Sequence, residues 1–259
     1  MLPFQSAGKP KGWAAAGGGI VPVGAPLSFS LAAFMAAQSD GLWLDFSSPA
    51  RLFQNTDEAT PVTATGQVIG RVNDRRTGTN SPRNATQATA AAKPKYQTTG
   101  AAFDGVDDNL LTGYTAGAGA NFIVAKVTVP GTLSAIQVIA GAANGAAERC
   151  WVGVDNTTGF LRCGVGASLT HLGTTDLRGL ANVPVGLSFN GSTVRVFVGS
   201  AQEYEGAQTG VPTVVHPIRL GSNNNVGAAS SMFGGTITSI AAGREFIDLA
   251  RFNQIASQL

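Results

Sequence analysis

The chain has 259 residues, of which 44% are apolar and only 12% are charged, and its formal net charge is +2. This length accommodates one large domain with extensions, and so weak a net charge gives no ground for a nucleic-acid-binding protein. The 34 glycines and the scarcity of charge differ from an ordinary cytosolic enzyme and fit either a sandwich with many tight turns or a protein largely covered by partners.

The start of the chain carries no recognisable secretory signal, because Lys9 and Lys11 are not followed by an apolar core. The longest apolar run, residues 27–37, is interrupted by Ser28 and Ser30. It is far shorter than the roughly 20 residues that a membrane-spanning helix needs. We therefore expect a protein that is made in a cytoplasm, does not follow the secretory path and does not insert into a membrane.

Residues 1–40 form the first predicted unit, an N-terminal arm rich in Gly, Ala and Pro. Pro22, Pro26 and the three glycines at 17–19 oppose regular structure over its first half. From Leu27 onward apolar residues recur at helical spacing, which predicts one short helix that ends near Gly41. Such a helix cannot bury its apolar face alone. It packs either on its own domain or on another subunit, and the second reading makes the arm an assembly element.

Residues 41–259 form the second predicted unit, an all-β antiparallel sandwich. In residues 41–46 apolar positions alternate, so Leu42 and Leu44 share one face while Trp43 lies on the other. Further strands are predicted at 122–129, 134–140, 149–154, 160–165, 183–190, 193–199, 201–205, 217–221 and 233–242, and a short C-terminal helix at 247–259. Short strands separated by turns at this spacing are typical of a sandwich.

A polar, irregular stretch, residues 47–101, separates the first strand from the others. It carries a basic cluster of Arg71, Arg75, Arg76, Arg83, Lys93 and Lys95. The cluster could bind an acidic glycan, contact an acidic neighbouring subunit or face solvent, and we expect a solvated or subunit-facing loop. No aromatic residues are interleaved with the arginines, which argues against binding of single-stranded nucleic acid.

The two cysteines, Cys150 and Cys163, flank a turn segment at residues 155–158. If that segment is a four-residue hairpin loop, Val154 pairs with Gly159 and the two cysteines lie opposite one another, which permits a cross-strand disulfide. The alternative, which we favour, is a pair of buried free thiols that act as small apolar side chains.

Several segments, taken in order, resemble the successive strands of one known domain family. AFDGVDDNLLTGY, beginning at Ala102, resembles the opening of the laminin-G-like (concanavalin A-like lectin) jelly roll. The later segments VGVDNTTGFLRCGVG, LANVPVGLSFNGSTVRVFVGS and IRLGSNNNVG resemble its following hairpins. The resemblance implies a concanavalin-like jelly roll, usually a binding or assembly domain. Chains that pair such a domain with an opening like GLWLDFSSPARLFQ resemble virion proteins of tailed phages.

Catalytic chemistry is not expected. A glycosidase needs two carboxylates that face one sugar, and the nearest pattern is Glu203 and Glu205, which strand alternation places on one face of what we read as a solvated edge. His171 and His216 have no evident nucleophile or acid partner. We predict no catalytic residue, no cofactor and no enzyme activity.

Calcium is the one ion that the resemblance suggests. Asp104, Asp107 and Asp108 lie within one turn, and Asn223–Asn225 form a polar loop. Calcium prefers several such oxygen ligands. The favoured alternative is that Asp104 and Asp107 accept hydrogen bonds from backbone amides of their own turn, so no metal site is assigned.

Two functions follow from these observations. The first is a non-enzymatic structural protein of a tailed-phage virion, either a tail tip or fibre or a capsid decoration, which the arm attaches to other virion proteins and which we expect to form a homotrimer. The second is a carbohydrate-binding adhesin module that recognises a host-surface polysaccharide. Its candidate glycan contacts are Trp43, opposite the core face of its strand, and Tyr114, in a glycine-rich loop.

Overall fold

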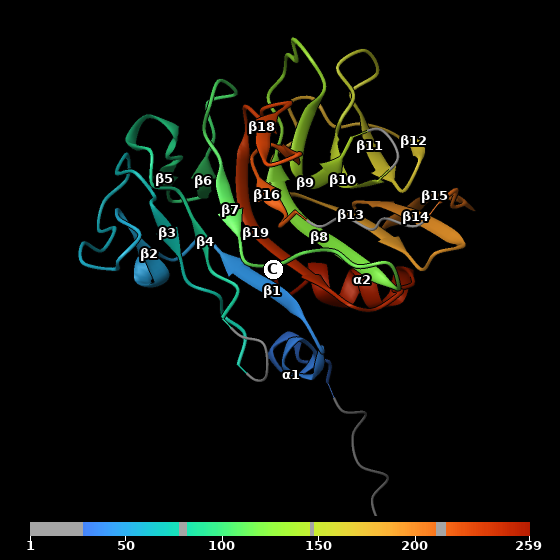
Figure 1. The fold of residues 1–259 in the computed structure, drawn as a ribbon, viewed down its shortest axis with the longest axis horizontal. Coiled ribbons are helices and arrows are strands. Elements are labelled where there is room, and N and C mark those ends of the chain that lie inside the picture. Colours follow the sequence, from blue (N-terminus) through green and yellow to red (C-terminus); the bar gives the residue numbers. More distant parts are fainter. Residues whose placement is uncertain (1–27, 78–81, 146–147, 211–215) are drawn as a thin grey trace, which may run out of the picture.

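The computed structural model describes residues 28–77, 82–145, 148–210 and 216–259, and the first part of the predicted arm, residues 1–27, lies outside them. Within these ranges the chain is an antiparallel β-sandwich with one short helix near each end, α1 (Leu31–Ala37) and α2 (Leu249–Ala256) (Figure 1). This confirms the predicted fold class. Neither helix is long and apolar enough to cross a bilayer.

The first sheet, called sheet A, runs in the order β15-β14-β13-β8-β19-β6-β5, with β1 also paired to β19. Its strands are β1 (Gly41–Asp45), β5 (Lys95–Gln97), β6 (Gly100–Ala102), β8 (Asn121–Thr128), β13 (Val183–Phe189), β14 (Thr193–Val198), β15 (Ala201–Ala207) and β19 (Thr236–Gly243). The predicted hairpin across residues 190–192 is present, because Phe189 pairs with Val194 and Gly191 has a positive φ of 94°. Glycine adopts this backbone conformation without the steric cost that a side chain brings.

The second sheet, called sheet B, runs in the order β12-β11-β10-β9-β16-β7-β4-β3-β2. Its strands are β2 (Leu52–Phe53), β3 (Arg71–Val72), β4 (Ala85–Thr86), β7 (Leu110–Thr112), β9 (Gln137–Asn144), β10 (Glu148–Val154), β11 (Phe160–Val165), β12 (Ser168–Asp176) and β16 (Arg219–Leu220). The hairpin of β17 (Asn223–Asn225) and β18 (Ala228–Ser230) adds to it through a parallel pairing of β17 with β9. The expected polar loop at 223–225 is therefore a strand.

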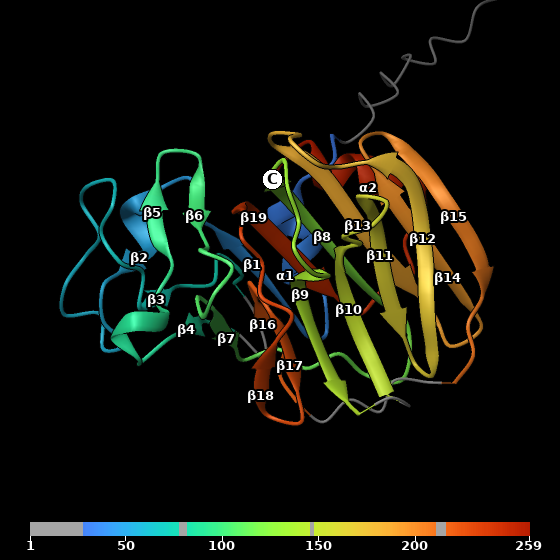
Figure 2. The same ribbon diagram turned by 90° about the horizontal axis from the view of Figure 1, so that it is seen from above.

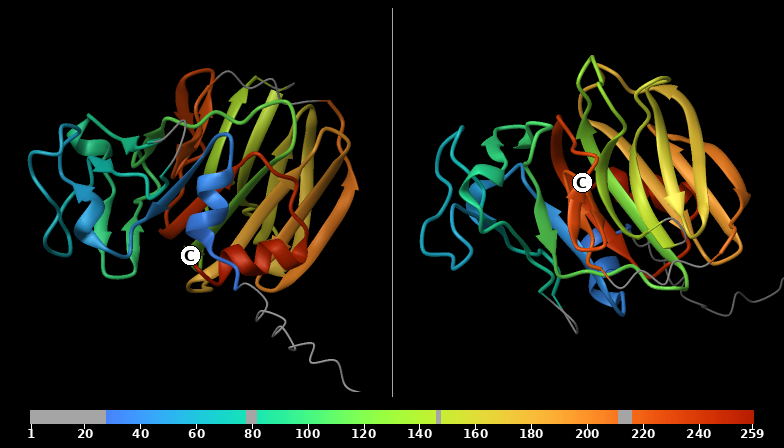
Figure 3. Two further views of the ribbon diagram at one scale, coloured as in Figure 1. Left: turned by 90° about the horizontal axis from the view of Figure 1, so that it is seen from below. Right: turned by 45° about the horizontal axis from the view of Figure 1, so that its top comes forward.

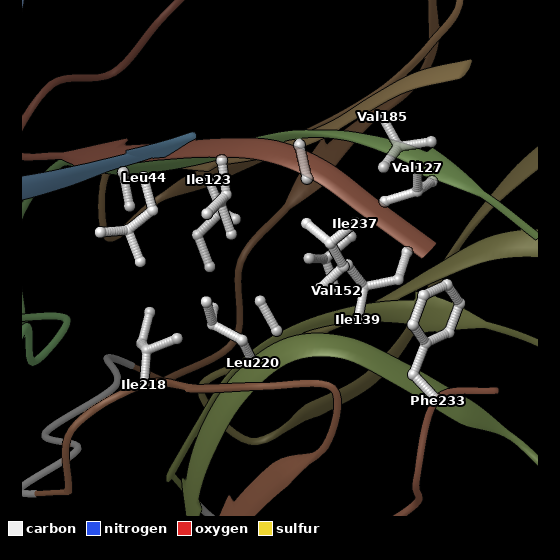
Figure 4. Close-up of a cluster of buried hydrophobic side chains, with 14 of the residues drawn as sticks. Leu44, Ile123, Val127, Ile139, Val152, Val185, Ile218, Leu220, Phe233 and Ile237 are labelled. Atoms are coloured by element: carbon white, nitrogen blue, oxygen red, sulfur yellow. The ribbon is translucent and has the colours of Figure 1, made fainter. Parts of the chain in front are cut away.

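The inward faces of the two sheets form one hydrophobic core. Figure 4 shows Leu44, Ile123 and Val127 of sheet A above Ile139 and Leu220 of sheet B, and all five are fully buried or nearly so. Alternation along each strand sends every second side chain into this layer, as the sequence pattern predicted. Burial of so much apolar surface is the main favourable contribution to folding.

Both helices cover the outer face of sheet A (Figure 3, left). Leu31 and Met35 of α1 and Phe252 of α2 are fully buried in a second apolar cluster against that face, which also contains Trp43. Of the two alternatives for the predicted N-terminal helix, the structure has the helix on its own domain. Residues 28–40, assigned above to the arm, thus pack on the sandwich.

The basic cluster is tied into the fold, which corrects the expectation of a solvated or subunit-facing loop. Arg76 is buried and donates hydrogen bonds to the carbonyls of Met35, Gln38 and Gly41 at the C-terminal end of α1. The other arginines of the cluster each pair with a carboxylate, Arg71 with Glu58, Arg75 with Asp45 and Arg83 with Asp40. The long polar stretch that carries the cluster contributes short strands at one end of the molecule, here called the edge lobe (residues 49–77 and 82–112), on the left in Figures 1 and 2.

Candidate functional site

A pocket of about 400 Å³ lies where the edge lobe meets the β17–β18 hairpin, and we call it the rim pocket. Four parts of the chain form it: residues 87–92 and 106–109 of the edge lobe, Arg219 of β16, and residues 229–232 at the end of the hairpin. Its lining residues are Gln87, Thr89, Ala92, Val106, Asp107, Asn109, Arg219, Ala229, Ser230 and Met232. Its volume lies in the range of small-molecule sites.

Asn109 holds the floor of the rim pocket in place. Its side-chain Oδ1 accepts hydrogen bonds from Gln87 Nε2 at 2.9 Å and from Arg219 Nη1 at 3.0 Å. Its own Nδ2 donates to the carbonyl of Asp107 at 2.7 Å. Asn109 is buried, and burial lowers the pKa of the Arg219 guanidinium from its usual value. The pocket floor is thus a fixed polar surface whose side chains hold one another in position.

Other polar groups at the rim pocket have no hydrogen bond to the described residues. These are the carboxylate of Asp107 and the hydroxyls of Thr89 and Ser230. Val106, which is 75% exposed, and Met232 add apolar surface beside them. The carboxylate accepts hydrogen bonds, and the hydroxyls both donate and accept them. Together with the adjoining apolar surface, these groups suit a ligand that carries hydroxyl groups and C–H faces.

The turn at residues 104–108, called the acidic turn, is held by its own carboxylates. Asp104 Oδ1 accepts hydrogen bonds from the backbone amides of Val106 at 2.8 Å, Asp107 at 3.2 Å and Asp108 at 3.4 Å. Asp108 Oδ2 accepts from the amide of Asp104 at 3.0 Å, and Gly105 adopts a positive φ of 77°. The sequence FDGVDD therefore encodes a self-capped turn, as expected for Asp104, but the second capping carboxylate is that of Asp108 and not, as expected, that of Asp107.

The carboxylates of the acidic turn differ in pKa. Burial and the nearby charge of Asp104 raise the pKa of Asp108 from 3.8 to about 6. Burial also acts on Asp104, but hydrogen bonds from Val106, Asp107 and Asp108 outweigh it and lower the pKa of that carboxyl. The environment thus shifts the pKa values of two neighbouring carboxyl groups, Asp104 and Asp108, in opposite directions.

Asp104, Asp107 and Asp108 could present one oxygen each to a cation, since their candidate ligand atoms lie within 4.8 Å of one another. Backbone amides already occupy one oxygen of Asp104 and one of Asp108, and that capping accounts for the cluster without an ion. We therefore assign no metal to the acidic turn. A second hollow, of about 360 Å³, lies on its other flank, where Phe103, Lys93 and Lys95 line it.

The two residues predicted to contact a glycan lie elsewhere. Tyr114 is fully buried, and its hydroxyl donates to Asn121 Oδ1 at 3.1 Å, so it presents no surface to a sugar. Trp43 is only 7% exposed, because it packs in the cluster under α1 and the Arg75 guanidinium lies 4.4 Å from its ring centroid. Neither residue lines the rim pocket.

The register of the β10–β11 hairpin corrects the prediction for the cysteines. Val154 pairs with Leu161 instead of Gly159, which moves Cys163 opposite Val152 and Cys150 opposite Val165. The physical reason is a four-residue loop shifted by one position: the Asp155 amide donates to the carbonyl of Phe160 at 3.0 Å, and the Asp155 carboxylate caps the loop by accepting from the amides of Thr157 and Thr158. Both cysteines are free, fully buried thiols in the core.

Glu203 and Glu205 do not share a face. A β-bulge between β14 and β15 falls at Glu203 and interrupts the alternation. Glu203 accepts hydrogen bonds from the amides of Thr174 and Thr175 on the edge of sheet B, while Glu205 pairs with Arg195. Each carboxylate thus fastens neighbouring strands, and the two do not form the acid pair of a glycosidase.

The residues of the rim pocket were not singled out from the sequence. Gln87 and Asn109 are separated from Arg219 by more than 100 positions, and each is an ordinary polar residue in or beside a very short strand. The one available signal was Arg219 within the otherwise apolar segment PIRLG, where a charged side chain interrupts a buried strand.

No protein-family model matches the chain, and no curated protein sequence matches it. Among solved structures, the chain is similar to a Trypanosoma rangeli sialidase, with a TM-score of 0.55 and 15% identity over 83% of this chain. The match spans only 36% of the sialidase. It is also similar to the CBM40 domain of the Ruminococcus gnavus IT-sialidase, with a TM-score of 0.46 and 15% identity over 54% of this chain and 84% of that domain. At such identities the first likeness shows a shared sandwich fold and nothing further.

Proposed function

We propose that this chain is a non-catalytic carbohydrate-binding module whose ligand occupies the rim pocket. The observation that carries the proposal is the convergence of Asp107, Asn109, Arg219 and Ser230 with the apolar side chain of Val106 around one hollow of about 400 Å³. No single segment of the chain could supply this set, and the hydrogen bonds to Asn109 fix its floor.

A saccharide is the ligand class that these groups suit best. Adjacent sugar hydroxyls both donate and accept hydrogen bonds, which matches a carboxylate acceptor beside hydroxyl groups. The apolar side chains of Val106 and Met232 can cover the C–H face of a sugar ring. The Trypanosoma rangeli sialidase, whose fold is similar, was solved in complex with sialic acid, which agrees with a carbohydrate ligand at the level of fold.

The proposed module binds a sugar without cleaving it, because the described lining residues of the rim pocket include no pair of carboxylates. Glu203 and Glu205 are each bonded within the fold and lie away from the rim pocket. Of the pocket's groups only Asp107 offers an exposed carboxylate, and a glycosidase needs a second one across the sugar. The module is therefore expected to bind its sugar and leave it unchanged.

Asp107→Asn tests the proposal, because it keeps the size of an exposed side chain and changes only its hydrogen-bonding character. The best sugar from a glycan array is titrated into the native protein and the variant, with Asp57→Asn in the edge lobe as the matched control. A loss of affinity of about tenfold or more is expected for Asp107→Asn alone, since a hydrogen bond to a charged group is worth about 1.5–3 kcal/mol. Equal affinity of all three proteins would contradict the rim pocket as the site.

We further propose that the module is displayed on a tailed-phage virion, with residues 1–27 as its attachment. The support is the sequence resemblance to virion proteins of tailed phages that pair an opening like GLWLDFSSPARLFQ with a laminin-G-like domain. Attachment to other virion proteins and a homotrimeric state belong to this proposal. Deletion of residues 1–27 should yield a folded domain that no longer joins particles, and incorporation of the shortened chain would overturn it.

A further inference from the structure

Arg149 stands apart from the other arginines of the described residues. Each of the others donates a hydrogen bond or forms an ion pair within the described part of the chain, whereas Arg149 Nη1 is buried without a hydrogen-bond partner and no carboxylate pairs with it. Burial and the like charge of Arg162 lower its pKa. A half-buried guanidinium without a counter-charge costs folding free energy, so an anion bound beside Arg149 would stabilise the folded protein.

Arg149 lies on the outer face of sheet B, next to Trp151 on the same face of β10. Trp151 lies against the neighbouring strands: a Cβ atom added to Gly141 would meet its Cβ at 2.2 Å, and one added to Gly164 would meet its Nε1 at 2.4 Å. The indole therefore fills the space that two glycines leave. Neither α1 nor α2 covers this face, because both lie on the opposite side of the sandwich (Figures 2 and 3).

Two more buried polar atoms near Trp151 have no partner. Arg162 Nε is unpartnered although Arg162 Nη1 pairs with Asp155 at 2.9 Å, and Asn223 Oδ1 lies 3.3 Å from the position of an added Cβ on Gly141. The face thus offers guanidinium donors and one amide oxygen that accepts. Because Asp155 neutralises Arg162, Arg149 leaves one positive charge uncompensated.

We propose that this face is a second binding site, specific for an acidic saccharide, in which Arg149 pairs with the sugar's anionic group and Asn223 Oδ1 accepts from one of its hydroxyls. A simple inorganic anion would satisfy the guanidinium donors but not the amide acceptor, whereas an acidic sugar supplies both groups. Arg149, Trp151 and Asn223 do not line the rim pocket, although Asn223 pairs with Ser230 of its wall.

The test is a titration of the full-length chain with oligogalacturonate, dextran sulfate and neutral dextran. Binding of either acidic polymer, but not of dextran, is expected, and the two acidic probes separate carboxylate from sulfate recognition. Arg149→Gln should weaken that binding by about tenfold or more, since it removes a charge-assisted contact. Arg178→Gln, which removes an equal charge from an exposed arginine paired with Asp176, should leave it within about twofold.

Further variants separate this site from a general electrostatic effect and from the rim pocket. Asn223→Asp places a carboxylate beside the anion and should weaken binding as strongly as Arg149→Gln, while thermal unfolding shows that both variants fold. Equal losses in Arg149→Gln and Arg178→Gln, or no binding of either acidic polymer, would overturn the proposal. Loss of binding in Asp107→Asn with retention in Arg149→Gln would also overturn it, although the rim pocket would then be supported.

Discussion

Arg76 Nε donates a hydrogen bond to the carbonyl oxygen of Met35 at 3.1 Å, across 41 positions of sequence. The same guanidinium donates from Nη1 to Gly41 and from Nη2 to Gln38, so one buried side chain satisfies three carbonyls at and beyond the end of α1. The Met35 carbonyl also accepts from the backbone amide of Gln38 at 3.4 Å, and the guanidinium adds a buried, charged donor to each of the three carbonyls. Arg76 thus fastens the N-terminal helix to the edge lobe and to the sandwich.

Replacement of Arg76 by methionine should destabilise the protein by about 2–4 kcal/mol. The variant retains much of the apolar stem but loses three buried hydrogen bonds from a charged donor. Urea unfolding followed by tryptophan fluorescence measures the change. Arg178→Met, at an exposed ion pair, is the control and should change stability by less than about 1 kcal/mol. A loss for Arg76→Met no larger than that of the control would contradict the role given to Arg76.

The stability of an N-terminally truncated chain should depend on whether α1 is retained. A chain that begins at Ser28 keeps α1, whereas one that begins at Gly41 loses the fully buried Leu31 and Met35 and two of the Arg76 partners. The shorter chain should be less stable by about 3–6 kcal/mol, because two core side chains are each worth about 1.5–3 kcal/mol. Denaturant unfolding of the two truncated chains measures this directly, and equal stability would mean that α1 packs too weakly to belong to the domain.

Asp108 should give the protein a specific pH dependence. Its folded pKa of about 6 lies above its usual 3.8, so between these values the folded protein holds a proton that the unfolded chain has released. The contribution to stability is therefore present below about pH 4 and is lost as the pH rises through about 6, by up to about 3 kcal/mol. Asp108→Asn lacks this titration.

The measurement for Asp108 is the difference in unfolding free energy between the native protein and Asp108→Asn at pH 4 and at pH 7. Subtraction removes the contributions of other carboxyls, such as Asp104, whose lowered pKa acts in the opposite direction. The native protein should lose stability relative to the variant on going to pH 7. A difference that is constant with pH would show that burial does not perturb Asp108.

The thiols of Cys150 and Cys163 should be inert in the native protein. Both are fully buried, and burial raises the pKa of Cys150 to about 12 and that of Cys163 still further. Since the thiolate is the reactive form, native protein at pH 8 should not react with a thiol reagent such as DTNB, whereas protein unfolded in guanidinium should release two equivalents. Failure of the unfolded protein to react without prior reduction would reveal a disulfide.

The sandwich could be predicted from the sequence because its strands bury alternate side chains. The pattern of apolar residues predicts strands such as β8, β13 and β14 for this reason. The strand β12 was missed, because its segment SLTHLGTTD is largely polar and pairs at the edge of sheet B. The predicted register of the cysteines is wrong by two residues, because the four-residue loop begins one position later, where the Asp155 amide bonds to the Phe160 carbonyl.

The candidate sites could not be predicted in the same way. The rim pocket depends on Arg219 reaching Asn109 across 110 positions, a contact that local periodicity does not encode. Trp43 was correctly placed opposite the core face, but the sequence did not reveal that α1 and Arg75 cover it. The acidic turn was readable, because the bonds of Asp104 are to amides only two to four residues away.

The most direct test of carbohydrate recognition at the rim pocket is a glycan array probed with the native protein, with Ala229→Trp and with Ala201→Trp. Ala229 is an exposed residue of the pocket wall, so tryptophan there fills the pocket, whereas Ala201 is an equally exposed alanine on the edge strand β15. Apart from acidic glycans bound at the Arg149 face, we predict a defined set of bound glycans that Ala201→Trp retains and Ala229→Trp loses. Absence of any bound glycan, or the same set for Ala229→Trp, would contradict the proposed function.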